Sequence, residues 1–172
     1  MQDARPSARA LYPAGVRLAP QGARTYFVTT VTANRRRLFQ VQTTANLMLD
    51  ILQGYRKQDR FSLHAFVIMP DHLHVLITPA PDVSLEKAVQ FIKGGFSFRL
   101  KSKREIWERS FNEVQIRTAE KFEACRRYIE ENPVRGHIAI SAREYEFSSA
   151  RWPEMVDPVP DHFVRTASII RG

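Results

Sequence analysis

Apolar and β-branched residues gather in four short segments of the chain. The first three segments predict β-strands at 25–32 (TYFVTTVT), 61–69 (FSLHAFVIM) and 72–78 (HLHVLIT). A short fourth strand is predicted at EVQIR, residues 113–117. Pro70 and Asp71 separate the second and third strands, and this turn-forming pair indicates that the two strands run antiparallel.

Apolar residues recur at helical spacing in the segments between these strands. Three helices are predicted, at about 43–58, 85–100 and 119–131. Ser84 and Thr118 are suitable N-caps for the second and third helix. Gly94 and Gly95 are expected to kink or loosen the second helix, and Pro133 is expected to stop the third.

The order of these elements is β-α-β-β-α-β-α, which is typical of the ferredoxin-like, split β-α-β class of α+β folds. We therefore expect one antiparallel sheet with the helices packed on one face, and with the other face free for a site. No internal repeat or second domain is visible. Residues 1–24 are expected to form a basic, flexible arm, residues 25–150 the folded domain, and residues 151–172 an irregular tail.

Length and composition fit this interpretation. The chain has 172 residues, of which 44% are hydrophobic, enough for one domain with a real core. No apolar run approaches the roughly 20 residues that span a bilayer, so we expect no membrane association. Cys125 is the single cysteine, which fits a reducing, cytoplasmic compartment.

Charge narrows the choice of partners. The formal net charge is +8 and the isoelectric point is about 10.1, a balance that favours nucleic acid, although a merely basic protein would share it. The basic residues are clustered as phosphate-binding residues often are. Those predicted to bind DNA are Arg35, Arg36, Arg37, Lys101, Lys103, Arg104 and Arg117.

The segment MPDHLHVLI carries the most specific chemistry in the chain. Side chains two apart on a strand share a face, so His72 and His74 lie side by side. They form either a divalent metal site or a polar face turned to water. In the last helix, Tyr128 and Asn132 are one turn apart, so a phenol and an amide oxygen can face one site. Their alternative roles are a packing tyrosine and a helix C-terminal residue.

Several neighbouring residues have two interpretations each. Asp71 either orients one of the histidines from behind or is only a turn residue. His64 is expected to face the same way as the residues two and four positions further on, as a hydrogen-bonded structural histidine. Trp107 and Phe111 suit stacking on unpaired bases, although core packing is the role we expect.

The sequence also resembles a known family. Residues 64–79 (HAFVIMPDHLHVLITP) are similar to the HUH signature of single-tyrosine transposases, and residues 128–138 (YIEENPVRGHI) resemble the tyrosine-helix signature of the REP-associated tyrosine transposases. The segments FVTTVTANRRRLF, IWERSFNEVQIR and EYEFSSA match that family's pattern in order and spacing, so the resemblance covers about residues 26–150. Two departures are Asn112-Glu113-Val114, where many relatives have a His-Asp-His-like stretch, and Gly136-His137-Ile138 in place of the usual Gly-Leu.

The resemblance implies a set of roles. His72 and His74 would bind a divalent metal, Mg²⁺ or Mn²⁺, with Asn132 completing the site. Tyr128 would be the nucleophile that forms a 5′-phosphotyrosine link. The substrate would be single-stranded DNA beside a hairpin of the REP type, and the protein would act in the bacterial cytoplasm, at the nucleoid, as a monomer or homodimer. The alternatives are a non-cleaving binder of structured DNA or RNA, and a metal phosphodiesterase that uses water.

Overall fold

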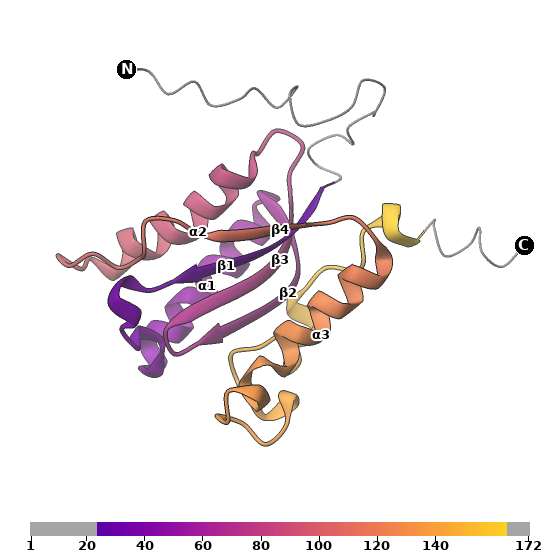
Figure 1. Cartoon of the computed structure of the whole chain (residues 1–172). Coiled ribbons are helices and arrows are strands. Elements are labelled where there is room, and N and C mark those ends of the chain that lie inside the picture. The colour runs from indigo at the N-terminus through magenta and orange to yellow at the C-terminus, as the bar shows by residue number, and fades with distance from the viewer. Residues whose placement is uncertain (1–23, 165–172) are drawn as a thin grey trace, which may run out of the picture.

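The computed structural model describes residues 24–164, which form one four-stranded antiparallel sheet flanked by three helices (Figure 1). The strands are β1 (Thr25–Val31), β2 (Phe61–Met69), β3 (His72–Pro79) and β4 (Asn112–Ile116). The helices are α1 (Gln42–Lys57), α2 (Leu85–Leu100) and α3 (Ala119–Arg135). Short 3₁₀ turns occupy Ala33–Arg35, Leu38–Gln40, Ala142–Glu144 and Pro153–Met155. The strand order β2-β3-β1-β4 confirms the predicted ferredoxin-like α+β class.

Helices α1 and α2 cover one face of the sheet and form the larger core with it. Alternate residues of β2 and β3 point toward these helices, as strand geometry requires. The buried side chains of this core include Met48, Leu52, Phe66, Leu73, Val75, Ile77, Ile92 and Phe96. This face is therefore closed by apolar packing.

Helix α3 lies on the opposite face, so the prediction that all helices share one face is wrong for this helix. Its apolar stripe of Phe122, Cys125 and Ile129 packs on Val67 and Leu76 of the sheet. Strand β2 is apolar on both faces, and its second face must be covered as well. Helix α3 covers the side of the sheet formed by β2 and β3 and lies beside β2 in Figure 1.

The half of this face formed by β1 and β4 is more open. Phe27 of β1 is only partly buried, and Val114 of β4, its partner in the strand register, is 46% exposed. An accessible strip of sheet therefore borders α3 on the side away from β2.

A bulge in β2 turns His64 toward α3. The pairing register of β2 with β3 shifts between Leu63 and Ala65, and the His64 ring packs edge-on against Phe122 at 5.5 Å. The prediction that His64 faces the same way as Phe66 is therefore wrong. Its expected structural role is confirmed, because the two ring nitrogens bond to Thr78 Oγ1 at 2.8 Å and to a main-chain oxygen, that of residue 158, at 2.9 Å.

Helix α3 also runs further than predicted. Pro133 does not stop it, because a proline near the end of a helix removes only one late main-chain bond. The helix continues to Arg135, and its last carbonyls are then satisfied by Gly136 N–H donating to Asn132 O at 2.9 Å and Ile138 N–H donating to Pro133 O at 3.0 Å. The extra turn brings Arg135 onto the same helix as Tyr128.

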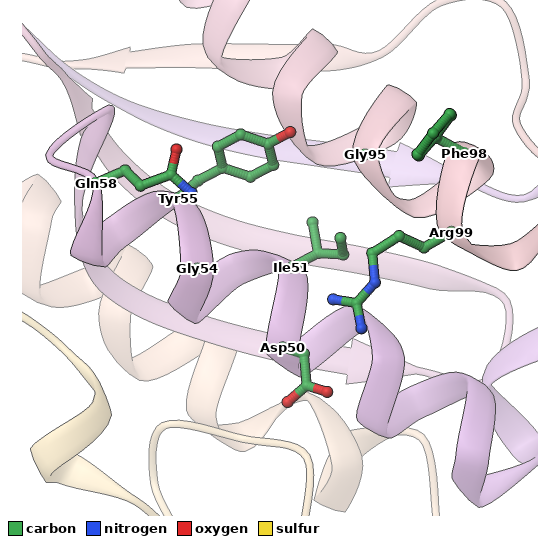
Figure 2. Close-up of a pocket in the computed structure, with 8 residues that line it drawn as sticks. All are labelled: Asp50, Ile51, Gly54, Tyr55, Gln58, Gly95, Phe98 and Arg99. Carbon is green, nitrogen blue, oxygen red and sulfur yellow. The ribbon is translucent and has the colours of Figure 1, made fainter.

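Helix α2 is continuous through its two glycines. Helix α1 approaches α2 closely at Gly95, since a Cβ added there would lie 2.9 Å from the Tyr55 ring, whereas one added at Gly94 would meet nothing closer than 4.0 Å. The expected kink is absent. Gly95 serves helix packing, and Figure 2 shows the Tyr55 ring extended toward it.

The chain after α3 returns along the free edge of β2. Ile68 N–H donates to Phe147 O at 2.9 Å, and Asp157 N–H donates to Leu63 O at 2.6 Å, which protects the edge strand. Phe163 is buried near Phe122 of α3. The predicted arm, residues 1–24, lies outside the described residues except for its last position. Among residues 24–164, no helix is long and apolar enough to cross a membrane.

Candidate active site

The two histidines of β3 lie together beneath α3. Their ring centroids are 4.7 Å apart with the planes at 75°, and His74 is only 6% exposed. Strand alternation places them on the face that carries Leu76, which α3 partly covers. The pair thus lies where a covered part of the sheet meets its open half.

Each imidazole uses its Nδ1 atom for a hydrogen bond to the protein. His72 Nδ1 lies 2.6 Å from Asp71 Oδ1, and His74 Nδ1 lies 2.7 Å from Thr29 Oγ1. An ionised carboxylate only accepts, so His72 donates from Nδ1, and in the neutral ring Nε2 then carries the lone pair. A threonine hydroxyl that accepts from His74 would leave Nε2 free in the same way. Both rings can therefore present Nε2 to a common ligand. In metal sites, hydrogen bonds to the other ring nitrogen orient ligating histidines in the same way.

The electrostatics of His74 favour its neutral form. Burial, and secondarily the neighbouring His72, lower the pKa of His74 from 6.5 to about 3. Neutral imidazole is the form that binds metals. The ring also stacks on Phe27 at 5.3 Å, which fixes its plane from the β1 side.

Tyr128 reaches this pair from α3. Its ring lies edge-on to His74 at 5.8 Å and to Phe27 at 5.9 Å, and its side chain is 39% exposed. The Arg135 guanidinium lies 5.1 Å from the centre of the Tyr128 ring. Two signatures more than fifty residues apart in the sequence thus meet in one accessible place.

Asn132 is one helical turn beyond Tyr128 and is partly buried. One further turn along, Gly136 packs against Met69, whose strand partner is His72. Asn132 therefore lies along α3 between the level of His74 and the level of His72. Its role as a third ligand stays a prediction. Among residues 24–164, no group of three His, Cys, Asp or Glu side chains could hold a metal, so a site here needs a donor of another type.

The donor chemistry of the site fits a divalent cation. Two Nε2 atoms with fixed rings and an amide oxygen are ligands that Mn²⁺ accepts readily, whereas Mg²⁺ prefers oxygen. One carboxylate oxygen of Asp71 accepts from His72 Nδ1 and so orients the ring, and the other lies 3.4 Å from Arg35 Nη1.

The predicted DNA-binding residues separate into two places. The arginines of the turn after β1 adjoin the loop that carries Lys101, Lys103 and Arg104, because Ala33 N–H donates to Ile106 O at 2.8 Å. The three basic residues of this loop are exposed. Arg117 follows β4 at the opposite end of the sheet, where it bonds to Gln115. The structure thus brings the arginines of the turn after β1 next to the basic residues of the loop 101–104, and leaves Arg117 apart.

Trp107 and Phe111, which also suit stacking on bases, pack in the core. Trp107 is 7% exposed, lies against Phe39 and Phe96, and donates from Nε1 to Lys93 O at 3.1 Å. Phe111 is partly buried against the same core. The expectation of core packing is confirmed for both residues.

Two residues of the site are not predicted from the sequence. Thr29 and Phe27 belong to a strand recognised from its composition, but their contact with His74 depends on the register of β1 against β3. In that register Thr29 is directly opposite His74, and Asn112 of β4 is opposite Thr29 on the other side. The alternation of β1 was the one available signal, and it could not show which partner strand lies alongside.

A groove lies elsewhere on the molecule, away from the histidine pair. It has a volume of about 250 Å³ and runs between α1 and α2, with Tyr55, Gly95 and Arg99 among the residues that line it (Figure 2). It lies on the helices that cover the other face of the sheet and contains none of the predicted site residues.

Comparison with known proteins identifies the family of the chain. A family model described as "Transposase IS200 like" matches residues 23–132, more than half of the chain, and includes His72, His74, Tyr128 and Asn132. The chain therefore belongs to the IS200-like transposase family, which confirms the family predicted from the sequence.

A solved structure shows the same fold. The structure of a REP-associated tyrosine transposase bound to a REP hairpin is similar with a TM-score of 0.69 and 23% identity, covering 86% of this chain and 90% of that one. A structure described as "a putative transposase from Deinococcus radiodurans R1" has a TM-score of 0.48 and 22% identity, covering 70% of this chain and 95% of that one. No curated protein matches the chain significantly.

Proposed function

We propose that this protein cuts and rejoins single-stranded DNA beside a hairpin, through a covalent 5′-phosphotyrosine intermediate. The observation that carries the proposal is the meeting of an accessible tyrosine with a pair of histidines whose Nδ1 atoms are both occupied. A protein that only binds DNA needs neither feature. Membership of a transposase family supports strand transfer as the reaction class.

The roles of the residues follow from their chemistry. His72 and His74, through Nε2, and Asn132, through its amide oxygen, would hold a divalent cation, Mg²⁺ or Mn²⁺. When bound, such an ion polarises a phosphate oxygen and orients the phosphodiester. Asp71 and Thr29 lie within hydrogen-bond distance of the two Nδ1 atoms, and they would hold the rings in the tautomer and plane that this requires.

Tyr128 supplies the nucleophile. Its oxygen attacks phosphorus and its proton passes to water. The bond from phosphorus to the 3′ oxygen breaks, and that oxygen takes a proton from water, which releases a 3′-OH. Arg135 places a positive charge beside the phenol as the proton leaves. The phosphotyrosine ester conserves the energy of the broken bond, so attack by another 3′-OH reverses the step and rejoins DNA without ATP.

The proposed substrate is DNA with a REP-type hairpin, the partner present in the structure of the REP-associated transposase. The united basic clusters adjoin the turn that carries Asp71 and would follow the DNA backbone. The open strip of β1 and β4 leads to Tyr128 and can receive the unpaired strand. Because the tyrosine and both histidines meet within one chain, a monomer suffices for the site. We expect this chemistry to take place on DNA in the bacterial cytoplasm.

One experiment tests the proposal. A labelled hairpin oligonucleotide with single-stranded flanks and Mn²⁺ should give a protein–DNA adduct that survives denaturation. Tyr128→Phe should abolish the adduct and leave binding intact. Tyr55→Phe removes a phenol from the groove on the other side of the sheet and should keep the adduct.

The other outcomes separate the rival functions. Cleavage that survives Tyr128→Phe would show that water is the nucleophile, as in a metal phosphodiesterase. Tight binding by the native protein with no cleavage across several hairpins would show a non-cleaving binder.

A further inference from the structure

The turn after β1 has an unusual backbone. Asn34 and Arg35 both have positive φ values, 55° and 49°, a conformation that side-chain-bearing residues adopt at a cost. Asparagine tolerates it better than most residues, whereas arginine has no such preference. Two such residues in succession need a surrounding structure that holds them in place.

Hydrogen bonds within the turn and to two other segments hold it in place. Thr32 is fully buried, and its Oγ1 lies within hydrogen-bond distance of Arg36 O, at 2.7 Å, and of Asp71 O, at 2.9 Å. Asn34 N–H donates to Glu108 Oε1 at 3.0 Å. The turn is therefore tied both to the hairpin that carries His72 and to the loop after α2.

The turn gives its arginines different surroundings. The Arg36 guanidinium donates to the main-chain oxygen of Glu105, so it holds the neighbouring loop. Arg35 instead extends to Asp71, at 3.4 Å, and its side chain is 68% exposed. The other oxygen of the same carboxylate accepts from His72 at 2.6 Å. Arg35 is thus the arginine linked to the histidine pair.

The contact between Arg35 and Asp71 suits an exchangeable ligand. An exposed ion pair at this distance contributes little stability, so the guanidinium can change partners at small cost. A guanidinium also binds a phosphate through two parallel hydrogen bonds, which a carboxylate already engaged with His72 cannot match. The strained turn therefore presents a pre-positioned phosphate-binding group at the edge of the site.

We propose that Arg35 binds a backbone phosphate next to the one that is cut, and so positions the strand. Arg35 lies on the Nδ1 side of His72, while the reacting phosphate would face Nε2, so the imidazole separates the two phosphates. This inference rests on the proposed function, because the cut defines which phosphate is adjacent.

Single methylphosphonate replacements test this role. The native protein first gives the cut position through its adduct. Binding is then measured in the Tyr128→Phe background, without cleavage, for oligonucleotides that carry one neutral methylphosphonate at each position around the cut. Arg35→Asn removes the guanidinium and suits the left-handed backbone, and Arg35→Lys keeps the charge without the paired donors.

On unmodified DNA, Arg35→Asn should weaken binding at least about tenfold, as the loss of a charged hydrogen bond does. The loss should disappear when the methylphosphonate is one or two nucleotides from the cut, because the partner charge is already absent. Arg35→Lys should lie between. Arg37→Asn, two residues along the same turn, should show no such dependence on that position.

The results separate the two proposals. An absent adduct would overturn the proposed function. An adduct combined with an Arg35→Asn loss that no methylphosphonate changes, or with coupling only at a distant phosphate, would overturn the role of Arg35 alone. Unchanged thermal unfolding of Arg35→Asn would confirm that its binding defect is not a folding defect.

Discussion

Replacing Thr29 with valine tests whether the histidine pair binds its ligand through Nε2. Thr29 Oγ1 lies 2.7 Å from Nδ1 of His74, a ring that is 6% exposed. Valine keeps the shape of threonine but removes the oxygen. Nδ1 of His74 would then lose its hydrogen-bond partner in a buried place, and the ring would be free to change tautomer or orientation.

The size of the effect follows from these contacts. Leaving one buried donor unpaired costs about 1–3 kcal/mol of unfolding free energy, and the lower end is expected because Thr29 itself is only partly buried. Loss of an outer-shell partner of a ligating histidine typically weakens metal binding by roughly 10–100-fold. At roughly 1.4 kcal/mol per tenfold, that range is about 1.4–2.8 kcal/mol of binding free energy.

Calorimetric titration with Mn²⁺ measures the binding, and urea unfolding measures the stability. Thr29→Ser keeps the hydroxyl and should retain most of the affinity, which separates the hydrogen bond from the packing of the methyl group. If Thr29→Val bound Mn²⁺ within twofold of the native protein, the second-shell role of Thr29 would be refuted, and Nε2 ligation by His74 would lose its support.

Three further predictions address packing, pH and DNA. Gly94→Ala should raise the free energy of unfolding by roughly 0.5–1 kcal/mol, since its methyl group meets nothing closer than 4.0 Å. Gly95→Ala should lose that gain, because its methyl group falls 2.9 Å from the Tyr55 ring. Equal gains for the two variants in urea unfolding would contradict the close approach of the helices. Burial lowers the pKa values of His64 and His74, so as the pH falls these histidines are protonated in the unfolded chain before they are protonated in the folded protein. The free energy of unfolding should therefore fall as the pH drops below 6.5, by up to about 1.4 kcal/mol per pH unit for each histidine. His64→Gln should make this fall shallower, and an unchanged slope in urea unfolding between pH 7.5 and 5.5 would count against the neutral histidine. Neutralising the three basic residues of the loop 101–104 should weaken DNA binding and reduce its salt slope by about 2–3, and an equal slope would exclude this surface from the DNA interface.

Local patterns in the sequence predict much of this protein. Alternation along the third strand was enough to place His72 and His74 on one face, because that relation depends only on strand geometry. Helical spacing similarly placed Tyr128 and Asn132 on one side of the last helix. Both inferences concern residues a few positions apart, where the backbone alone determines direction.

The side of the sheet that α3 covers could not be predicted from helical spacing. The one signal present was the nearly continuous apolar run of β2, which is typical of a strand buried on both faces. The bulge at His64 was hidden for a similar reason, since an extra residue in a strand changes the face of a side chain without a mark in the composition.

The sequence by itself determined the elements, the fold class and the residue types of the site. Only the tertiary structure decided which residues meet: Thr29 with His74, Tyr128 with the histidine pair, and Arg35 with Asp71. These contacts join segments roughly 35 to 55 residues apart, and they depend on strand register, on the burial of β2 on both faces and on a turn tied to two other segments. Such properties arise from packing among distant segments, and no local period of the chain encodes them.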